Sequence, residues 1–211
     1  MTRTERTGTP ARYFETMYER ADDPWHLAER WYEERKYALT VAALPLPRYR
    51  RAFEPACSVG ELTRRLAGRC DELLAGDRVA SAVATARKRT AELDHVTVRQ
   101  LTVPEEWPDG TFDLIVLSEI LYYLDGGTTD RLLDRALGAL EPGGTLVTVH
   151  WDRPVAEHLA TGTGVADRLA SVPGLRLLAD HREPDFVLQV HGRDLHDGTP
   201  APTPAEHGGL V

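Results

Sequence analysis

The chain has 211 residues, of which 42% are hydrophobic and 27% are charged. That length fits a single domain with a sizeable core, and that composition excludes a disordered, collagen-like or membrane chain. The formal net charge is −8, and the basic residues are spread along the chain and do not form one stripe. This charge pattern argues against a nucleic-acid partner.

The cysteines and the N-terminus bear on the cellular compartment. Cys57 and Cys70 are the only cysteines, too few for a disulfide scaffold or a four-cysteine zinc site. Residues 1–10 contain no apolar leader segment, and nowhere do 18 apolar residues run together. We therefore expect a cytoplasmic protein with no membrane association and no metal.

The first fifty residues are rich in aromatic side chains. They hold eight of the 15 aromatic residues of the chain: Tyr13, Phe14, Tyr18, Trp25, Trp31, Tyr32, Tyr37 and Tyr49. Helical spacing predicts helices within residues 11–44, after a flexible segment, 1–10, and we expect these helices to form a lid over the ligand site. Asp23 and Pro24 have the pattern of an N-cap followed by a first-turn proline, so a second helix is expected to start at Trp25. The alternative for each aromatic residue is plain packing against the sheet.

From residue 44 onward, strand patterns alternate with helix patterns. The expected strands cover residues 51–56, 71–75, 95–101, 112–117, 145–150, 175–179 and 186–191, and the expected helices cover 61–67, 80–92, 129–140 and 154–170. The continuous apolar run over 112–117 is typical of a strand buried on both faces. The alternation predicts a Rossmann-like, doubly wound α/β domain over 11–191 with a mostly parallel, seven-stranded sheet.

Three turn-rich segments complete this prediction. The sequence E-P-G-G at 141–144 is a helix stop signal. The last two strands are joined by only a few residues, so they must be antiparallel. Residues 192–211 are rich in Gly, Pro, Asp and Thr without periodicity, and we expect a disordered tail there.

The predicted topology also locates a ligand site. Ligands of doubly wound sheets bind beyond the carboxyl ends of the strands, which selects the turn after the first strand. That turn reads E-P-A-C-S-V-G, and Gly60 alone meets a requirement of the dinucleotide fingerprint G-x-G-x-x-G. An NAD-dependent oxidoreductase is therefore disfavoured.

S-adenosylmethionine makes different demands, because it carries a sulfonium, an ammonium and a carboxylate but no phosphate. Glu54 supplies an acid at the entrance of the turn, and the second expected strand leads to Asp77. A carboxylate at that position can accept hydrogen bonds from both ribose hydroxyls. An aspartate that only caps the following helix is the alternative for Asp77, and Arg78 beside it could be a plain solvated neighbour.

Three runs carry a family resemblance: E-P-A-C-S-V-G-E-L-T-R-R-L-A, V-P-E-E-W-P-D-G-T-F-D-L-I-V-L-S-E-I-L-Y-Y-L and L-E-P-G-G-T-L-V-T-V-H-W. They resemble class I S-adenosylmethionine-dependent methyltransferases. The segments D-D-P-W and Y-E-E-R-K-Y are similar to the group around nodulation protein S, an N-methyltransferase acting on an amino sugar at the end of a chitooligosaccharide. The resemblance covers about residues 13–191.

The resemblance and the topology imply a set of cofactor contacts: Glu54, Ala56, Cys57, Ser58, Gly60, Asp77, Arg78, Thr102, Val103, Ser118, Glu119 and Ile120. The chain departs from the family pattern at Ala56 and Ser58, which replace the first two glycines of E-x-G-x-G-x-G. It also has Thr102 where family members often carry an adenine-binding aspartate. Alanine and serine are small enough to let the methionine part of the cofactor approach. We read Cys57 as a small turn residue and not as a nucleophile.

Methyl transfer from a sulfonium needs positioning and desolvation, and an amine or phenol acceptor must also lose a proton. Glu119 follows one expected strand and His150 ends another, so we expect one of them to act as the catalytic base. A structural histidine and a helix-capping or cofactor-contacting glutamate are the alternatives. The other histidines, His158 included, receive no role. The expected acceptor contacts are Tyr13, Tyr18, Trp25, Tyr32, Tyr37, Tyr122, Tyr123 and Trp151.

The sequence thus favours an S-adenosylmethionine-dependent methyltransferase of a small-molecule acceptor, specifically N-methylation of an amino sugar or a related metabolite. Two alternatives remain open. One is an O-methyltransferase of a natural-product pathway. The other is a non-catalytic protein that only binds S-adenosylmethionine, since three positions depart from the family pattern.

Overall fold

The structure is a computed structural model that describes residues 8–211. Most of the expected flexible segment, residues 1–7, lies outside the described residues. The described part of it is held in place at Thr9, whose backbone N–H donates to the Tyr123 carbonyl at 2.8 Å. The Thr9 hydroxyl donates to the carbonyl of Glu157 at 2.5 Å.

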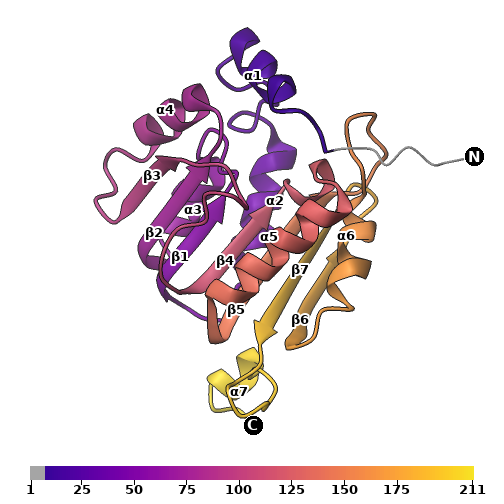
Figure 1. The fold of residues 1–211 in the computed structure, drawn as a ribbon. Coiled ribbons are helices and arrows are strands. Elements are labelled where there is room, and N and C mark those ends of the chain that lie inside the picture. Colours follow the sequence, from indigo (N-terminus) through magenta and orange to yellow (C-terminus); the bar gives the residue numbers. More distant parts are fainter. Residues whose placement is uncertain (1–7) are drawn as a thin grey trace, which may run out of the picture.

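A seven-stranded sheet forms the centre of the molecule (Figure 1). Its strands are β1 (Tyr49–Pro55), β2 (Cys70–Asp77), β3 (Val96–Gln100), β4 (Phe112–Ser118), β5 (Leu140–Trp151), β6 (Leu175–Arg182) and β7 (Phe186–Arg193). Their order is β3-β2-β1-β4-β5-β7-β6; β7 runs antiparallel to both of its neighbours, β5 and β6, and the other neighbouring pairs are parallel. This confirms the predicted fold class and places the point where strand order reverses between β1 and β4.

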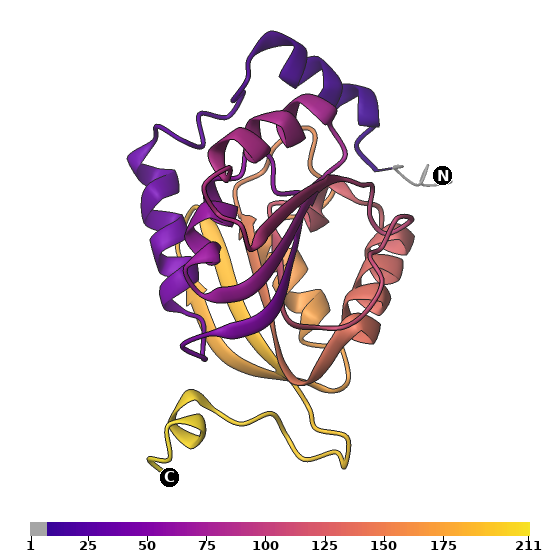
Figure 2. The ribbon, with the colours of Figure 1, turned by 90° about the vertical axis from the view of Figure 1, so that its left-hand side faces the viewer.

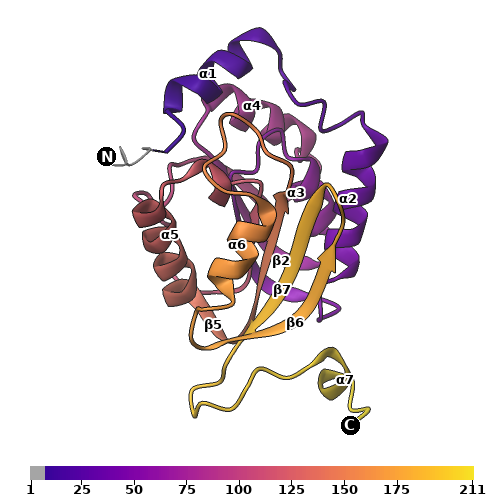
Figure 3. The same cartoon turned by 90° about the vertical axis from the view of Figure 1, so that its right-hand side faces the viewer.

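Helices cover both faces of the sheet. They are α1 (Ala11–Arg20), α2 (Trp31–Ala42), α3 (Glu61–Ala67), α4 (Ala80–Arg89), the 3-10 helix η1 (Leu121–Tyr123), α5 (Gly126–Ala139), α6 (Gly162–Leu169) and the short α7 (Pro204–His207). Figure 3 shows α2 and α3 on one face and α5 and α6 on the other. Helix α1 lies beyond the carboxyl ends of the parallel strands, and α7 lies below the opposite end (Figures 1 and 2).

Strand β4 shows why its sequence is apolar throughout. Its side chains alternate between the two faces of the sheet. Leu114 and Val116 pack in the core cluster that includes Leu62 of α3, whereas Ile115 and Leu117 belong to the cluster on the side of α5 and α6. Because helices bury both faces, neither set of positions can be polar.

The second helix begins six residues later than the capping signal predicts, at Trp31 and not at Trp25. Asp23 does accept hydrogen bonds from the N–H groups of Leu27 and Ala28, at 3.0 and 2.9 Å. However, His26 has a left-handed backbone conformation, with φ of 56°, so the chain cannot continue as an α-helix. The signal therefore marks a capped turn that precedes the helix.

The chain between β5 and α6 also differs from the expected helix over 154–170. Helix α6 starts only at Gly162, where the side chain of Thr161 accepts a hydrogen bond from the Gly164 N–H. Residues 154–160 form an irregular segment that passes over the carboxyl end of the sheet. This difference moves Val155 and His158 next to the site described below.

Two of the turn-rich segments differ in detail. The run 141–144 does not precede β5 but forms an irregularity within it, because the pairing with β4 passes from Phe112 opposite Leu140 to Leu114 opposite Thr145. The tail, for which the sequence predicts disorder, contacts the rest of the domain at Ala201. Ala201 is buried, and its carbonyl accepts a hydrogen bond from Arg176 at 2.8 Å. Within residues 8–211, no helix has both the length and the apolar character that a membrane span needs.

Candidate active site

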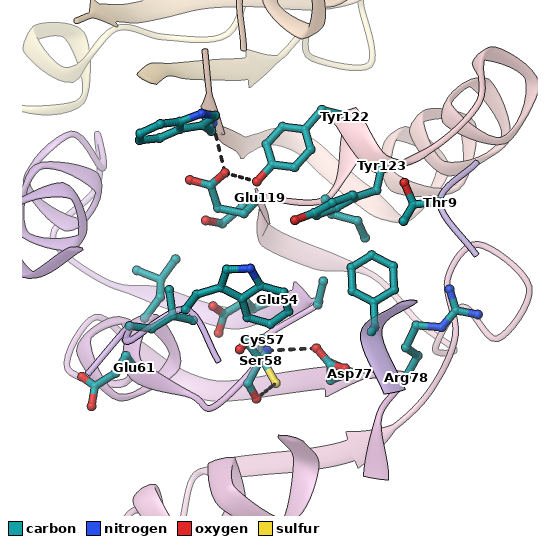
Figure 4. Close-up of a pocket in the computed structure, with 18 of the residues that line it drawn as sticks. Thr9, Glu54, Cys57, Ser58, Glu61, Asp77, Arg78, Glu119, Tyr122 and Tyr123 are labelled. Carbon is teal, nitrogen blue, oxygen red and sulfur yellow. Dashed lines mark hydrogen bonds between the residues drawn. The ribbon is translucent and has the colours of Figure 1, made fainter. Parts of the chain in front are cut away.

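A cavity of about 360 Å³ lies between the carboxyl ends of the central strands and the N-terminal segment. Figure 4 shows two groups of side chains facing each other across it. Glu54, Ser58 and Asp77 come from β1, the following turn and β2, and Glu119 and Tyr122 come from the chain after β4. The cavity therefore sits at the topological switch point, where doubly wound sheets bind ligands.

The turn after β1 takes the conformation of a glycine-rich loop without its glycines. Ala56 and Ser58 have left-handed backbones, with φ of 59° and 51°, and Gly60 has φ of 79°. Gly60 does not line the cavity but lies against α4, where an added Cβ would come within 2.9 Å of the Ala86 Cβ. The first two of these positions are those at which the family pattern has glycine, so the chain retains the backbone shape at the cost of strain.

Ser58 joins this turn to two other elements. Its N–H donates to a carboxylate oxygen of Asp77 at 3.0 Å. Its hydroxyl forms a short hydrogen bond with the hydroxyl of Tyr18 from α1. The other oxygen of Asp77 accepts from the Val79 N–H at 2.9 Å. Asp77 thus organises the backbone around the turn and also lines the cavity.

The acidic groups on this side are buried. Burial raises the pKa of Glu54 to about 8, although a hydrogen bond from the Thr63 hydroxyl, 2.6 Å away, lowers it. Burial likewise raises the pKa of Asp77, against the effect of its two backbone N–H donors. Burial also raises the pKa of the Cys57 thiol, which agrees with a small structural turn residue.

Residues at the carboxyl ends of β2, β3 and β4 form a further part of the cavity wall. Arg78, Thr102, Val103, Ser118 and Ile120 line it as expected. The Thr102 N–H is occupied by Glu106, which accepts it at 2.6 Å, so Thr102 offers mainly its hydroxyl.

Glu119 is the most constrained group of the opposite wall. It has φ of 54°, and its N–H donates to the Val149 carbonyl at 2.8 Å. One carboxylate oxygen accepts from the Lys36 ammonium at 2.6 Å, and the other accepts from the Trp151 N–H at 3.0 Å and from the Tyr122 hydroxyl. Burial raises the pKa of Glu119, but the charge of Lys36 and these donors outweigh it and lower the pKa overall.

Lys36 is a further functional candidate, one that no motif in the sequence predicts. It is only 2% exposed and forms ion pairs with Glu33 at 2.8 Å and Glu119 at 2.6 Å. Burial lowers the pKa of Lys36, but the two carboxylates raise it overall, so the ammonium stays charged. Its position in the aromatic Y-E-E-R-K-Y segment, as one of only two lysines in the chain, is the signal that could have identified it.

The structure does not bring His150 to the cavity. The residue is 1% exposed and does not belong to the cavity lining. Its Nε2 accepts the Leu121 N–H at 3.1 Å, and burial lowers its pKa to about 4. His150 is thus placed away from the cavity, and its burial and its contact with Leu121 fit the structural alternative.

The expected acceptor residues divide into two sets. Seven line the cavity: Tyr13, Tyr18, Trp25, Tyr37, Tyr122, Tyr123 and Trp151. Tyr32 does not, because its ring packs on Trp151 and Phe186 at centroid distances of 5.8 and 6.3 Å. Within the expected lid, α1 and residues 21–30 cover the cavity, whereas α2 packs against the sheet through Tyr37.

Twelve further lining residues were not anticipated: Thr9, Phe14, Leu27, Arg30, Glu33, Lys36, Glu61, Leu62, Leu101, Leu124, Val155 and His158. Most belong to segments whose path depends on tertiary packing, so no local pattern marks them. Within the described residues 8–211, no group of three or more His, Cys, Asp or Glu side chains could hold a metal ion.

The family model of nodulation protein S (NodS) matches residues 15–147. The chain belongs to the NodS family. Nodulation protein S from Rhizobium tropici is 34% identical over 132 residues, which are 60% of this chain and 54% of that protein. The chain therefore matches only about half the length of this curated relative.

Two crystal structures are also similar to this chain. A putative methyltransferase from Pseudomonas syringae is 47% identical, with a TM-score of 0.70 over 78% of this chain and 100% of the other. The N-methyltransferase NodS from Bradyrhizobium japonicum WM9, in complex with S-adenosyl-L-homocysteine, is 25% identical. Its TM-score is 0.76, over 85% of this chain and 97% of the NodS chain.

Proposed function

We propose that this NodS-family chain is an S-adenosylmethionine-dependent methyltransferase that methylates an amine of an amino sugar or a related small molecule. The observation that carries the proposal is the cavity at the switch point, which is lined by Asp77 on one side and by Glu119 on the other. The bound S-adenosyl-L-homocysteine of the related Bradyrhizobium N-methyltransferase supports the same chemistry.

The residues of the cavity fit this cofactor. Asp77 offers carboxylate oxygens at the end of β2, where ribose hydroxyls are expected. The left-handed turn at Ala56 and Ser58 keeps the backbone shape of the glycine-rich loop beside the methionine part. Leu101 and Ile120 provide apolar surface for a flat base. When bound, the cofactor supplies an activated methyl group on a sulfonium.

The opposite wall suits a cationic acceptor. Glu119 keeps its negative charge because Lys36, Tyr122 and the Trp151 N–H all donate to it. Glu33 and Glu119 together carry two negative charges against the single positive charge of Lys36. The excess charge favours an ammonium group, which an aromatic face such as that of Trp151 also attracts.

The test is methyl transfer from S-adenosylmethionine to a matched panel: glucosamine, N-acetylglucosamine and a phenolic metabolite. We expect methylation of glucosamine at nitrogen, identified by mass spectrometry and NMR, and none of N-acetylglucosamine, in which the amine is blocked. Methylation of the phenol alone would favour the O-methyltransferase alternative. Cofactor binding without transfer to any acceptor would favour the non-catalytic alternative.

A further inference from the structure

His158 lies on the irregular segment between β5 and α6, and it lines the same cavity as Glu119. Its ring stacks on Tyr122 with a centroid distance of 3.8 Å and an interplanar angle of 18°. The ring of Tyr123 packs edge-on against the His158 ring, with a centroid distance of 4.8 Å. Among the cavity-lining residues within 8–211, His158 contributes the only imidazole. The two tyrosines therefore fix the orientation of a titratable ring in the acceptor half of the site.

The backbone around this histidine is also anchored. The Leu159 N–H donates to the Tyr122 carbonyl at 2.7 Å, and the His158 N–H donates to the Val155 carbonyl at 3.1 Å. The carbonyl of Glu157 accepts the hydroxyl of Thr9 at 2.5 Å. The position of His158 is thus tied both to η1 and to the N-terminal segment.

Three titratable groups interact electrostatically with His158: Glu119, Glu157 and His150. Burial lowers the pKa of His158, whereas the negative charges of Glu119 and Glu157 raise it; the net direction is downward. His150 lies close enough to interact electrostatically, but burial keeps it neutral. The Nδ1 atom of His158 is buried and accepts or donates no hydrogen bond among the described residues. The lowered pKa keeps the ring neutral at neutral pH. Because Nδ1 is buried, Nε2 is the nitrogen that can accept a proton from a ligand in the cavity.

A second proton acceptor is needed because Glu119 is a weak base. Its carboxylate already accepts hydrogen bonds from Lys36, Tyr122 and the Trp151 N–H, which hold it in the ionised form. Tyr122 connects the two groups, since its hydroxyl donates to Glu119 and its ring stacks on His158. Glu119, which would bind the ammonium, and His158, which would take its proton, both contact Tyr122.

We propose that His158 is a catalytic residue that accepts the proton of the acceptor ammonium while Glu119 holds that ammonium in place. This assignment rests on the proposed function. One N–H bond of the ammonium breaks and one N–H bond forms on the imidazole, so a neutral amine and an imidazolium result. The imidazolium then returns the proton to water, and the total charge is conserved at each stage.

The experiment compares the wild type with His158→Gln and His158→Ala, using S-adenosylmethionine and glucosamine. We expect turnover at pH 7 to fall about 100-fold in both variants, with partial recovery of His158→Ala by added imidazole. The acid limb of the wild-type pH profile should be lost in His158→Gln. Affinity for S-adenosyl-L-homocysteine, measured by calorimetry, should change by less than about twofold. The matched control is His207→Gln on α7, which lies at the other end of the molecule and should behave as the wild type.

A readout independent of turnover is the pKa of His158, measured by NMR in the complex with S-adenosyl-L-homocysteine and assigned with His158→Gln. We expect a value below the 6.5 of a free histidine. A value above about 8 would overturn the proposal, because less than about a tenth of the ring would then be neutral at pH 7. Full turnover of His158→Gln would overturn it as well, and so would a parallel loss of cofactor affinity, which would indicate a structural role. A wild type that binds the cofactor but methylates no amine would instead refute the proposed function, on which this assignment depends.

Discussion

At the scale of single residues, Ala56 and Ser58 hold a backbone conformation that favours glycine. A left-handed alanine costs about 1–2 kcal/mol, whereas glycine adds about 0.4–1 kcal/mol of unfolded-state entropy. Ala56→Gly should therefore stabilise the fold by about 0.5–1 kcal/mol, measured by urea unfolding. Ala84→Gly is the control, because Ala84 lies exposed in α4 and its replacement should destabilise by about 1 kcal/mol. Destabilisation by Ala56→Gly would contradict the strain argument.

Lys36 is the residue whose loss should disturb the acceptor half most. Lys36→Met would leave Glu33 and Glu119 without their shared cation, at a cost of about 3–5 kcal/mol in unfolding free energy at pH 7. In the wild type, the lowered pKa of Glu119 contributes stability above the unfolded-state pKa, and this is lost as the pH falls through the folded-state value. The deficit of Lys36→Met should therefore shrink toward acidic pH.

The matched variant for this prediction is Lys36→Met combined with Glu33→Gln. It removes one positive and one negative charge and should recover part of the stability at pH 7. If Lys36→Met unfolded within about 0.5 kcal/mol of the wild type at pH 7, the buried ion pairs would have little energetic importance.

Some site residues were predictable and others were not. Asp77 and Glu119 directly follow or end a strand, so the topology alone assigns them to the carboxyl edge of the sheet. His150 lies in β5 and His158 follows that strand, and only tertiary structure shows which of the two reaches the cavity. His150 turns into the core beneath Tyr122, whereas the irregular path of 154–160 brings His158 to the cavity. No periodicity encodes that path.

At the scale of elements, α1 should behave as the cover of the cavity. Removing residues 1–20 deletes Tyr18, whose hydroxyl meets Ser58, together with the apolar contacts of Phe14. The truncated chain should keep its fold, because α2 and its core residue Tyr37 remain. Affinity for S-adenosyl-L-homocysteine should fall at least about tenfold, or about 1.4 kcal/mol, in calorimetry.

Two controls show whether a loss of affinity comes from removing α1 itself. A chain lacking only residues 1–7 should bind as the full chain does, and Tyr18→Phe should lose a smaller part of the affinity, about 0.5–1.5 kcal/mol. Unchanged affinity in a truncated chain with native circular dichroism would show that α1 does not cover the cofactor.

The elements themselves could be predicted where periodicity is strong. The strands β1 to β7 were all expected, because their short apolar runs are bounded by turns. The predicted starts of two helices, α2 and α6, were wrong because local capping interactions compete with continuation of the helix. Asp23 caps a turn that His26 ends, and Thr161 provides the real start of α6. Both errors lie in segments that border the cavity, whose conformation depends on tertiary contacts.

At the scale of the whole molecule, the buried Glu54 should make stability depend on pH. Its folded-state pKa is about 8, above its ordinary 4.5, so its contribution is full below the unfolded-state pKa and is lost as the pH rises through the folded-state value. Between pH 5 and 8, the wild type should therefore lose about 1.4 kcal/mol per pH unit relative to Glu54→Gln. Glu72→Gln, at an exposed side chain, should show no such difference from the wild type. Parallel pH profiles of the wild type and Glu54→Gln would contradict this assignment.

Calorimetric titration of the whole chain is the most direct test of whether the cavity at the switch point binds S-adenosylmethionine. We expect binding of S-adenosylmethionine and S-adenosyl-L-homocysteine with micromolar or tighter affinity, and at least about tenfold weaker binding by Asp77→Ala, in which the carboxylate for the ribose is lost. Absence of heat with either ligand on folded protein, or equal affinity of the wild type and Asp77→Ala, would contradict the account.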